Sequence, residues 1–143
     1  MWFIYIELND LKNVTAYNVA LYSRECKMAV HNIPEQKSID YSSLDAACLI
    51  MYEQEKGDVI AKTLDSYGLE KIDFMKLDCQ GSDYDVLVGG IETITRYRPV
   101  IIYEFERYPG VHDHNGSEYQ EFFKKINYNV KSIAGNNYLA TPK

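Results

Sequence analysis

Two apolar runs, each ending in a carboxylate, place the strongest constraint on how this chain can fold. Residues 72–77 read IDFMKL and are followed by Asp78, and residues 100–103 read VIIY and are followed by Glu104. In the intervening residues 83–97, apolar side chains recur at helical spacing. Buried strands joined by a helical crossover are typical of a parallel sheet, in which ligands bind beyond the carboxyl ends of the strands. The pattern therefore predicts an α/β fold with both acids at one edge of a sheet.

Local signals mark the ends of the crossover helices. Ser82, with Asp85 three residues later, forms an acidic variant of the capping box and predicts the start of a helix. Gly89 and Gly90 predict its end. The residue before a proline disfavours the helical conformation, so Pro99 excludes Arg98 from the second helical stretch.

The rest of the chain predicts more strands and one further helix. A clear amphipathic pattern favours a helix at 117–126, and the turn residues Gly135-Asn136 favour a hairpin at the end of the chain. Strands are predicted at 14–19, 26–31, 58–64, 128–133 and 137–141. We expect a single domain over residues 1–143, with a mostly parallel sheet and an antiparallel C-terminal hairpin.

Composition excludes several classes of protein. A net charge of −6 with dispersed arginines argues against a nucleic-acid partner, and the apolar stretches are too short for a membrane span. The first residues lack the basic region and cleavage site of a signal peptide. Cys26, Cys48 and Cys79 form no CxxC pair, which favours reduced thiols and argues against a zinc site. These features predict a cytoplasmic protein.

Four short motifs follow one another along the chain. They are Thr63-Leu64-Asp65-Ser66, Lys76-Leu77-Asp78-Cys79-Gln80-Gly81, Val86-Leu87-x-Gly89-Gly90 and Arg98-Pro99-x-x-x-x-Glu104. This set resembles the FkbM-type S-adenosylmethionine-dependent methyltransferases, whose pattern reads T-L-D-S, K-I-D-x-E-G-x-E-x-x-V-L-x-G-A and R-P-x-x-x-x-E. Residues 7–21 and 122–128 resemble the neighbouring family segments. The resemblance implies a Rossmann-like methyltransferase sheet, S-adenosylmethionine as cofactor, and methylation of a hydroxyl on a sugar or secondary metabolite.

The chain departs from the family pattern in three respects. Gln80 and Asp83 stand where the family usually has glutamates. In addition, no glycine-rich turn of the G-x-G-x-x-G kind occurs in the 143 residues, although such a turn lets backbone approach a cofactor closely. We therefore expect an N-terminally truncated form of the fold that holds half of the cofactor cradle.

The resemblance and the strand ends together nominate the site residues. Methyl transfer needs proximity, alignment and a base near the acceptor hydroxyl, and the catalytic candidates are Asp78 and Glu104. Alternatively, Asp78 caps the helix that begins near Ser82, and Glu104 is merely solvated. The resemblance places the following residues at the cofactor: Asn18, Ala20, Leu21, Asp78, Gln80 and Gly81. For Asn18 to Leu21, packing is the equal alternative.

For Lys76, the segment 112–114 and Cys79, a structural role is favoured over a catalytic or metal-binding one. Lys76, inside an apolar strand, is expected to snorkel or to pair with Asp65 or Asp78. The segment His112-Asp113-His114 lacks a third ligand at a defined spacing, so an exposed loop is favoured over a metal site. Cys79 has no histidine at a readable distance, which argues against a nucleophile.

The absent strands predict a partner. Without them, a sheet edge and an apolar face stay uncovered, so we expect a homo-oligomer or a partner that supplies the missing strands. The apolar run Trp2–Ile6 is expected to cover the gap or to reach a second copy. The alternative is a non-catalytic remnant or interaction module that retains the C-terminal half of the fold. The absent glycine turn favours this alternative, whereas Asp78, Gly81 and Glu104 favour the enzyme.

Overall fold

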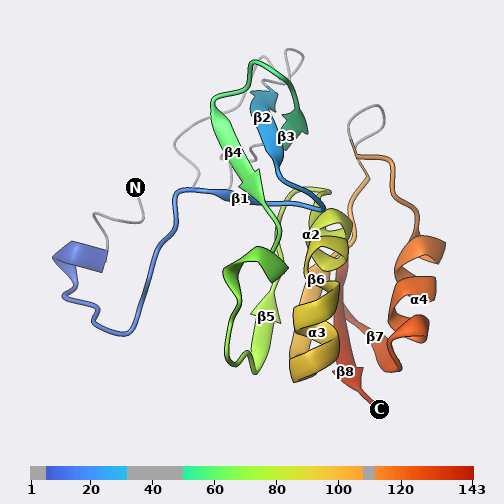
Figure 1. Ribbon diagram of the computed structural model, residues 1–143. Coiled ribbons are helices and arrows are strands. Elements are labelled where there is room, and N and C mark those ends of the chain that lie inside the picture. Colours follow the sequence, from blue (N-terminus) through green and yellow to red (C-terminus); the bar gives the residue numbers. More distant parts are fainter. Residues whose placement is uncertain (1–5, 32–49, 108–111) are drawn as a thin grey trace.

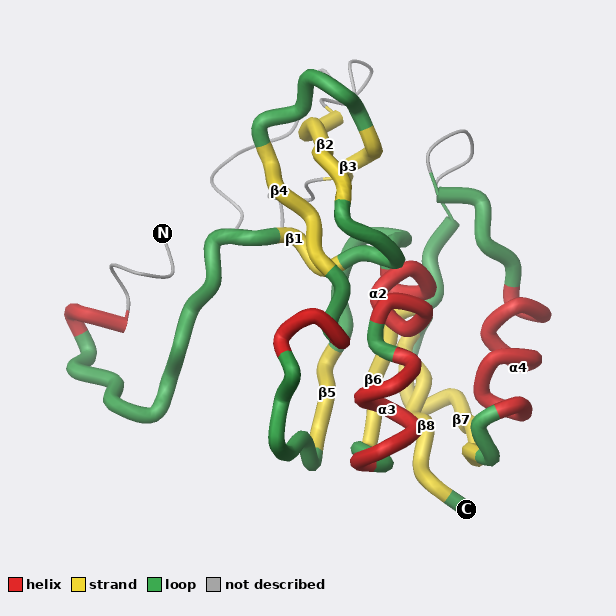
Figure 2. Tube along the Cα trace, viewed as in Figure 1, coloured by secondary structure: helices red, strands yellow, loops and turns green. Residues whose placement is uncertain are grey.

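The computed structural model describes residues 6–31, 50–107 and 112–143, which form two four-stranded sheets with helices (Figures 1 and 2). The expected α/β class is confirmed. Most of the N-terminal apolar run, and Cys48, lie outside the described residues. The elements are β1 (Ala20–Leu21), β2 (Cys26–His31), β3 (Ile50–Glu53), β4 (Val59–Lys62), η2 (Asp65–Tyr67), β5 (Phe74–Lys76), α2 (Asp83–Gly89), α3 (Ile91–Tyr97), β6 (Val100–Glu104), α4 (Gly116–Lys125), β7 (Tyr128–Ala134) and β8 (Asn137–Pro142).

Strands β5 and β6 are parallel neighbours, as the two apolar runs predict. Phe74 lies opposite Val100, and Lys76 lies opposite Ile102. Helices α2 and α3 form the crossover between them and lie over one face of the sheet (Figure 2). Arg98 is outside α3, at its C-cap, with a left-handed backbone (φ 56°). The predicted crossover is therefore confirmed.

The C-terminal hairpin completes this second sheet, whose strand order is β5-β6-β8-β7. β7 and β8 are antiparallel, and Gly135 takes the positive φ (54°) that the turn between them requires. β8 also pairs antiparallel with β6. The hairpin prediction is confirmed. At the other end of the order, β5 has one neighbour among the described strands, so its outer edge is unpaired there.

The first sheet has the order β1-β4-β2-β3 and departs from the expected topology. Only β1 and β4 are parallel; β2 is antiparallel to both β4 and β3. Across both sheets the described pairs are more often antiparallel than parallel, so the expectation of a mostly parallel sheet is wrong. Only residues 22–25 join β1 to β2. This connection is too short for the crossover that joins two consecutive parallel strands.

The strand predicted at residues 14–19 is also wrong, because β1 begins only at Ala20. Val14 is 45% exposed and Tyr17 is 63% exposed. In the described part of the chain, no strand lies beside this segment to provide ladder hydrogen bonds. A lone extended segment loses conformational entropy when it is ordered, and no hydrogen bonds to a neighbouring strand offset that loss. The predicted strands at 26–31 and 58–64 are present as β2 and β4, the latter with shorter bounds.

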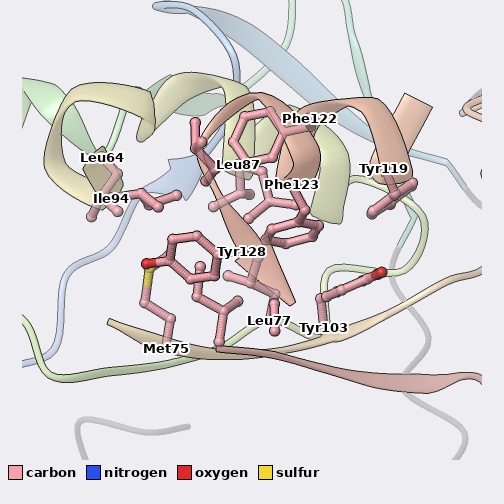
Figure 3. Packing of buried hydrophobic residues seen from close by; sticks show 14 residues of the cluster. Leu64, Met75, Leu77, Leu87, Ile94, Tyr103, Tyr119, Phe122, Phe123 and Tyr128 are labelled. Carbon is pink, nitrogen blue, oxygen red and sulfur yellow. The ribbon is translucent and has the colours of Figure 1, made fainter. Parts of the chain in front are cut away.

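The main core lies between the second sheet and its helices (Figure 3). Along β5, Met75 is buried while Phe74 and Lys76 are exposed, because successive strand residues face opposite sides. The same alternation along β6 buries Ile101 and Tyr103. The helices close this face with the buried residues Val86, Leu87, Ile94, Tyr119, Phe122, Phe123 and Ile126. A smaller cluster, Ala20, Met28 and Ala61, forms the core of the first sheet.

The first sheet lies near the end of the second sheet at which α2 begins (Figure 1). Two of the long-range contacts between them involve the residues that follow β1. The Ser23 hydroxyl donates to Asp85 Oδ1 at 2.9 Å, and the backbone of Tyr22 lies so close to Gly89 that a Cβ there would be 2.0 Å from the Tyr22 carbonyl oxygen. The carboxyl ends of β5 and β6 therefore face the junction of the two sheets.

Candidate functional site

The turn between β5 and α2 is built by unusual backbone angles. The Leu77 N–H donates to the Ile102 carbonyl at 2.8 Å, beyond the last residue of β5. Gln80 (φ 49°) and Gly81 (φ 89°) then take positive φ in succession. Glycine adopts such angles freely, whereas a side chain such as that of Gln80 does so rarely. The turn redirects the chain into α2 and leaves Asp78 at the strand end.

Asp78 and Glu104 meet at this edge. Each follows the apolar part of a parallel strand, with Lys76 opposite Ile102, and each carboxyl group contributes to the pKa shift of the other. The predicted juxtaposition of the two acids is thus confirmed. Their chemical roles stay predictions.

The pair is electrostatically asymmetric. Lys76 Nζ lies 3.1 Å from Asp78 Oδ2 and Gln80 Nε2 donates to Asp78 Oδ1 at 3.1 Å, and the hydrogen bond from Lys76 is the main cause that lowers the pKa of Asp78. Burial is the main cause that raises the pKa of Glu104, with the charges of Glu106 and Asp78 adding to it. Asp78 therefore takes the negative charge more readily than Glu104 does.

The pairing of Lys76 with Asp78 was one of the alternatives that the sequence offered for this lysine, and it is confirmed. The Lys76 ammonium also donates to the Leu77 carbonyl at 2.9 Å. Lys76 thereby links the strand end to the carboxylate.

Asp83 holds the two strand ends together, and sequence reasoning missed this role. Its side chain is fully buried, and its two oxygens accept the N–H of Cys79 at 2.9 Å and the N–H of Glu104 at 3.1 Å. Burial raises the pKa of Asp83, and the two backbone hydrogen bonds oppose that rise. One sequence signal was available for this role of Asp83: it is an acid at the first position of a helix, directly after the turn at a strand end.

The predicted capping box is wrong. The side chain of Ser82, the N-cap residue of α2, makes no cap hydrogen bond. Asp85 instead accepts from Ser23 and lies 3.0 Å from His114 Nε2. A capping box is present at α4, where Asn115 and Glu118 bond reciprocally to each other's backbone.

The segment that contains His112 and His114 is not an exposed loop, contrary to expectation. His112 is 3% exposed, and its Nε2 lies 2.6 Å from the Met51 carbonyl and 2.9 Å from Ser82 Oγ. A carbonyl can only accept, so Nε2 carries a proton and cannot take one from the Ser82 hydroxyl. This arrangement joins β3 to α2 and excludes a nucleophilic serine. In the described part of the chain, no group of three or more histidine, cysteine or acidic side chains has a metal-binding geometry.

The residues nominated for the adenine side lie in different environments. The Ala20 side chain is buried with Met28 and Ala61, so it packs in a core and does not line an open surface. Asn18 is exposed. Leu21 lines a cavity of about 300 Å³ together with Tyr17, Val19, Leu64, Tyr67 and Leu69. Of the three nominated residues, only Leu21 faces a cavity with its side chain.

Cys79 has the properties of a packing residue. It lies against the main core, and burial raises the pKa of its thiol to about 11. The thiolate, which is the nucleophilic form, is therefore scarce at neutral pH.

A scan against protein-family models matches residues 6–130 to the methyltransferase FkbM domain. The chain therefore belongs to the FkbM methyltransferase family. Searches of curated proteins and of solved structures gave no match. None of the helices in the described ranges has the length and apolarity that crossing a membrane requires.

Proposed function

We propose that this protein is an S-adenosylmethionine-dependent O-methyltransferase whose reaction centre is the pair Asp78 and Glu104, and that residues 1–143 form one methyltransferase-like domain. The observation that carries the proposal is that Asp78, whose pKa is lowered, lies beside Glu104, whose pKa is raised, at the carboxyl edge of two parallel strands. This edge is where open α/β sheets bind their ligands.

The residues at this edge fit one part of the cofactor. S-adenosylmethionine carries a cationic sulfonium and an ammonium group, and the negative charge of Asp78 attracts both. The positive φ of Gly81 brings backbone without a side chain to the same edge. The cavity beside Leu21 offers apolar and aromatic walls for an adenine ring.

When bound, the cofactor supplies an electrophilic methyl group. Transfer of this group would break its bond to sulfur and release the neutral thioether, and Asp78 would accept the proton that the acceptor hydroxyl loses as its oxygen forms the bond to the methyl carbon. The low pKa of Asp78 makes it a weak base, but the hydroxyl becomes strongly acidic as that bond forms, so a weak base suffices. Glu104, whose pKa is raised, would orient Asp78 by a hydrogen bond between the two carboxyl groups. Lys76 keeps Asp78 ionised.

The glycine-rich part of the cradle is proposed to come from outside the 143 residues, either from further residues of the same polypeptide or from a second subunit. The outer edge of β5 supports this proposal, since it has no partner among the described strands and its backbone N–H and C=O groups can pair with an added strand. Added strands there would extend the second sheet into a Rossmann-like sheet. A homo-oligomer is one way to supply them, and sedimentation of the protein at micromolar concentration distinguishes monomer from oligomer.

A non-catalytic interaction module is the second candidate. Two observations favour it: the sequence contains no glycine-rich turn, and the Ala20 side chain is buried away from any ligand surface. This module would bind a partner through β5 without binding cofactor.

Cofactor binding and methyl transfer separate the two candidates. Calorimetry measures S-adenosylmethionine binding, and a radiolabelled methyl assay with a panel of phenols and sugars measures transfer. We expect Asp78→Asn to abolish transfer and Glu104→Gln, which keeps a neutral donor, to retain most of it. Asp73→Asn is the matched control, because Asp73 forms an exposed ion pair with Lys71 on the same strand-entry loop. Absence of cofactor binding, with or without added subunits, would support the module and refute the enzyme.

A further inference from the structure

Among the described elements, the helices α2, α3 and α4 cover only one face of the second sheet. The core side chains of its strands, such as Met75 and Tyr103, point toward these helices (Figure 3). Successive strand residues face opposite sides, so the neighbours of the core residues point away from the helices. Four of these neighbours are apolar, are partly or largely exposed, and belong to neither core cluster. They form the apolar strip: Phe74, Val100, Ile102 and Leu139.

A lysine stands at each side of the apolar strip. Lys76 of β5 is paired with Ile102, and Lys131 of β7 is paired with Leu139. Ile102 and Leu139 are themselves paired, so this row of residues crosses all four strands. The two cations differ in their surroundings. Lys76 donates to Asp78 at 3.1 Å, whereas Lys131 is exposed and forms no ion pair with another described residue. The positive charge that is available to a partner therefore lies at the β7 side.

The carboxyl end of the apolar strip is acidic. Glu104 follows Ile102 by two residues along β6 and therefore lies on the same side of the sheet. Asp78 lies at the same end, just beyond the neighbouring strand β5. The N-terminus of a helix carries a partial positive charge, which carboxylates attract. A helix on the apolar strip is therefore favoured when its N-terminus lies at Glu104 and its axis runs antiparallel to β6.

The dimensions of the apolar strip fit one helix. Neighbouring strands lie about 4.8 Å apart, so the Cα atoms of Lys76 and Lys131 are about 14 Å from each other. A helix with its side chains is about 10–12 Å wide, and a strand of five residues such as β6 is about as long as three helical turns. A second copy of the chain fits less well. Packing of two copies face to face would bring four lysines into one interface, and each copy carries a net charge of −6.

We propose that the apolar strip binds an amphipathic helix of a partner chain. The apolar side of this helix contacts Ile102 and Leu139, acidic residues along one flank meet Lys131, and the N-terminus lies at Glu104. The inference goes beyond methyl transfer, because the apolar strip itself takes no part in the proposed reaction.

The test uses synthetic peptides and the full chain. The first peptide has about 18 residues, enough to form a helix at the site, with a stripe of leucines and a flank of glutamates. The second carries lysines in place of the glutamates, and the third has the residues of the first in scrambled order. Calorimetry measures the Kd, and amide shifts in ¹⁵N-labelled protein locate the contact. We expect the glutamate peptide to bind most tightly, with shifts along β6 and β8 and at Lys131.

Two variants test the contacts separately. Lys131→Glu should weaken binding of the glutamate peptide by about fivefold and tighten binding of the lysine peptide, because it reverses the charge at an exposed flank. High salt should remove both differences. Phe74→Thr should weaken binding of both peptides by about tenfold, because it removes exposed apolar area while it keeps a residue that favours strands. Lys62→Glu, at an exposed lysine of the first sheet, is the matched control and should bind as wild type.

Several outcomes would overturn the proposal. They are absence of glutamate-peptide binding, equal binding of the three peptides, and binding that Lys131→Glu and Phe74→Thr leave unchanged in proteins with wild-type urea midpoints. Self-association that Phe74→Thr abolishes would place a second copy on the apolar strip instead. Competition between the peptide and vesicles of phosphatidylserine and phosphatidylcholine would make a lipid surface the occupant. The methyl-transfer assay of Asp78→Asn is independent of these measurements, so failure of this inference and failure of the proposed reaction are distinguishable.

Discussion

Replacement of Asp83 tests how the two strand ends are held in register. In Asp83→Ala, the N–H groups of Cys79 and Glu104 lose their acceptor, and no water can fully replace a carboxylate that is completely buried. Asp83→Asn keeps one carbonyl oxygen, but it turns an amide donor toward one of these N–H groups. The first variant removes both hydrogen bonds, and the second removes one.

The magnitude follows from the two donors. A buried donor left unsatisfied costs about 1–3 kcal/mol, so two such donors cost roughly 2–6 kcal/mol. Both N–H groups are only partly buried, and loss of the carboxylate relieves the desolvation that raises its pKa. We therefore expect Asp83→Ala to lower the free energy of unfolding by about 2–3 kcal/mol and Asp83→Asn by about 1–2 kcal/mol. The exposed control Asp73→Ala should stay within about 0.5 kcal/mol.

Urea unfolding measures these differences, and hydrogen exchange locates them. The amide protons of Cys79 and Glu104 should both lose protection in Asp83→Ala, whereas only one of them should lose it in Asp83→Asn. The pH dependence has a defined sign: burial raises the pKa of Asp83 in the folded state, so the folded protein binds this proton more tightly. The stability of the wild type relative to Asp83→Asn should therefore fall as the pH rises from about 4 through the raised pKa.

A change of less than about 0.5 kcal/mol in Asp83→Ala, with unchanged protection of both amides, would refute the reasoning. It would show that the strand ends keep their register without Asp83. A relative stability that rises with pH over the same range would contradict the sign of the pKa shift.

Three further predictions use the same unfolding assay. Gly89→Ala should cost about 2–3 kcal/mol, because its Cβ would lie 2.0 Å from the Tyr22 carbonyl oxygen. Gly90→Ala should be milder, because its Cβ would meet the Leu64 side chain at 2.9 Å and the Val86 carbonyl oxygen only at 3.3 Å, and equal losses in the two variants would contradict the Tyr22 contact. Tyr119→Phe should be neutral or stabilising by up to about 1 kcal/mol, since it removes a buried hydroxyl for which the described residues offer no hydrogen-bond partner, and a clear loss of stability would reveal one. Arg98→Lys should cost about 1–2 kcal/mol, because two guanidinium hydrogen bonds to carbonyls at the end of α4 are lost. A urea midpoint equal to that of the wild type would show that these hydrogen bonds do not stabilise the fold.

Local patterns were sufficient for the second sheet. The apolar runs that end in Asp78 and Glu104, the turn at Gly135 and the amphipathic pattern of α4 each depend on residues close together in the sequence, and each predicted its element correctly. Because parallel strands end at the same edge, the approach of the two acids followed directly from that reading.

Local patterns were misleading for the first sheet. Residues 14–19 have the apolar character of a strand, but β structure also requires a neighbour, and none lies beside them in the described residues. The polar connection at residues 22–25 gave no sign that β4 would insert between β1 and β2.

The sequence by itself determined the crossover, the hairpin and the position of Asp78 and Glu104 at one edge, because periodicity and turn chemistry act over a few residues. Only the tertiary structure decided that Asp83 joins two strand ends, that Asp85 bonds Ser23 from 62 residues away, and that His112 is buried against Met51. A buried polar side chain takes whichever partner the packing brings to it, and such a partner leaves no local pattern in the chain.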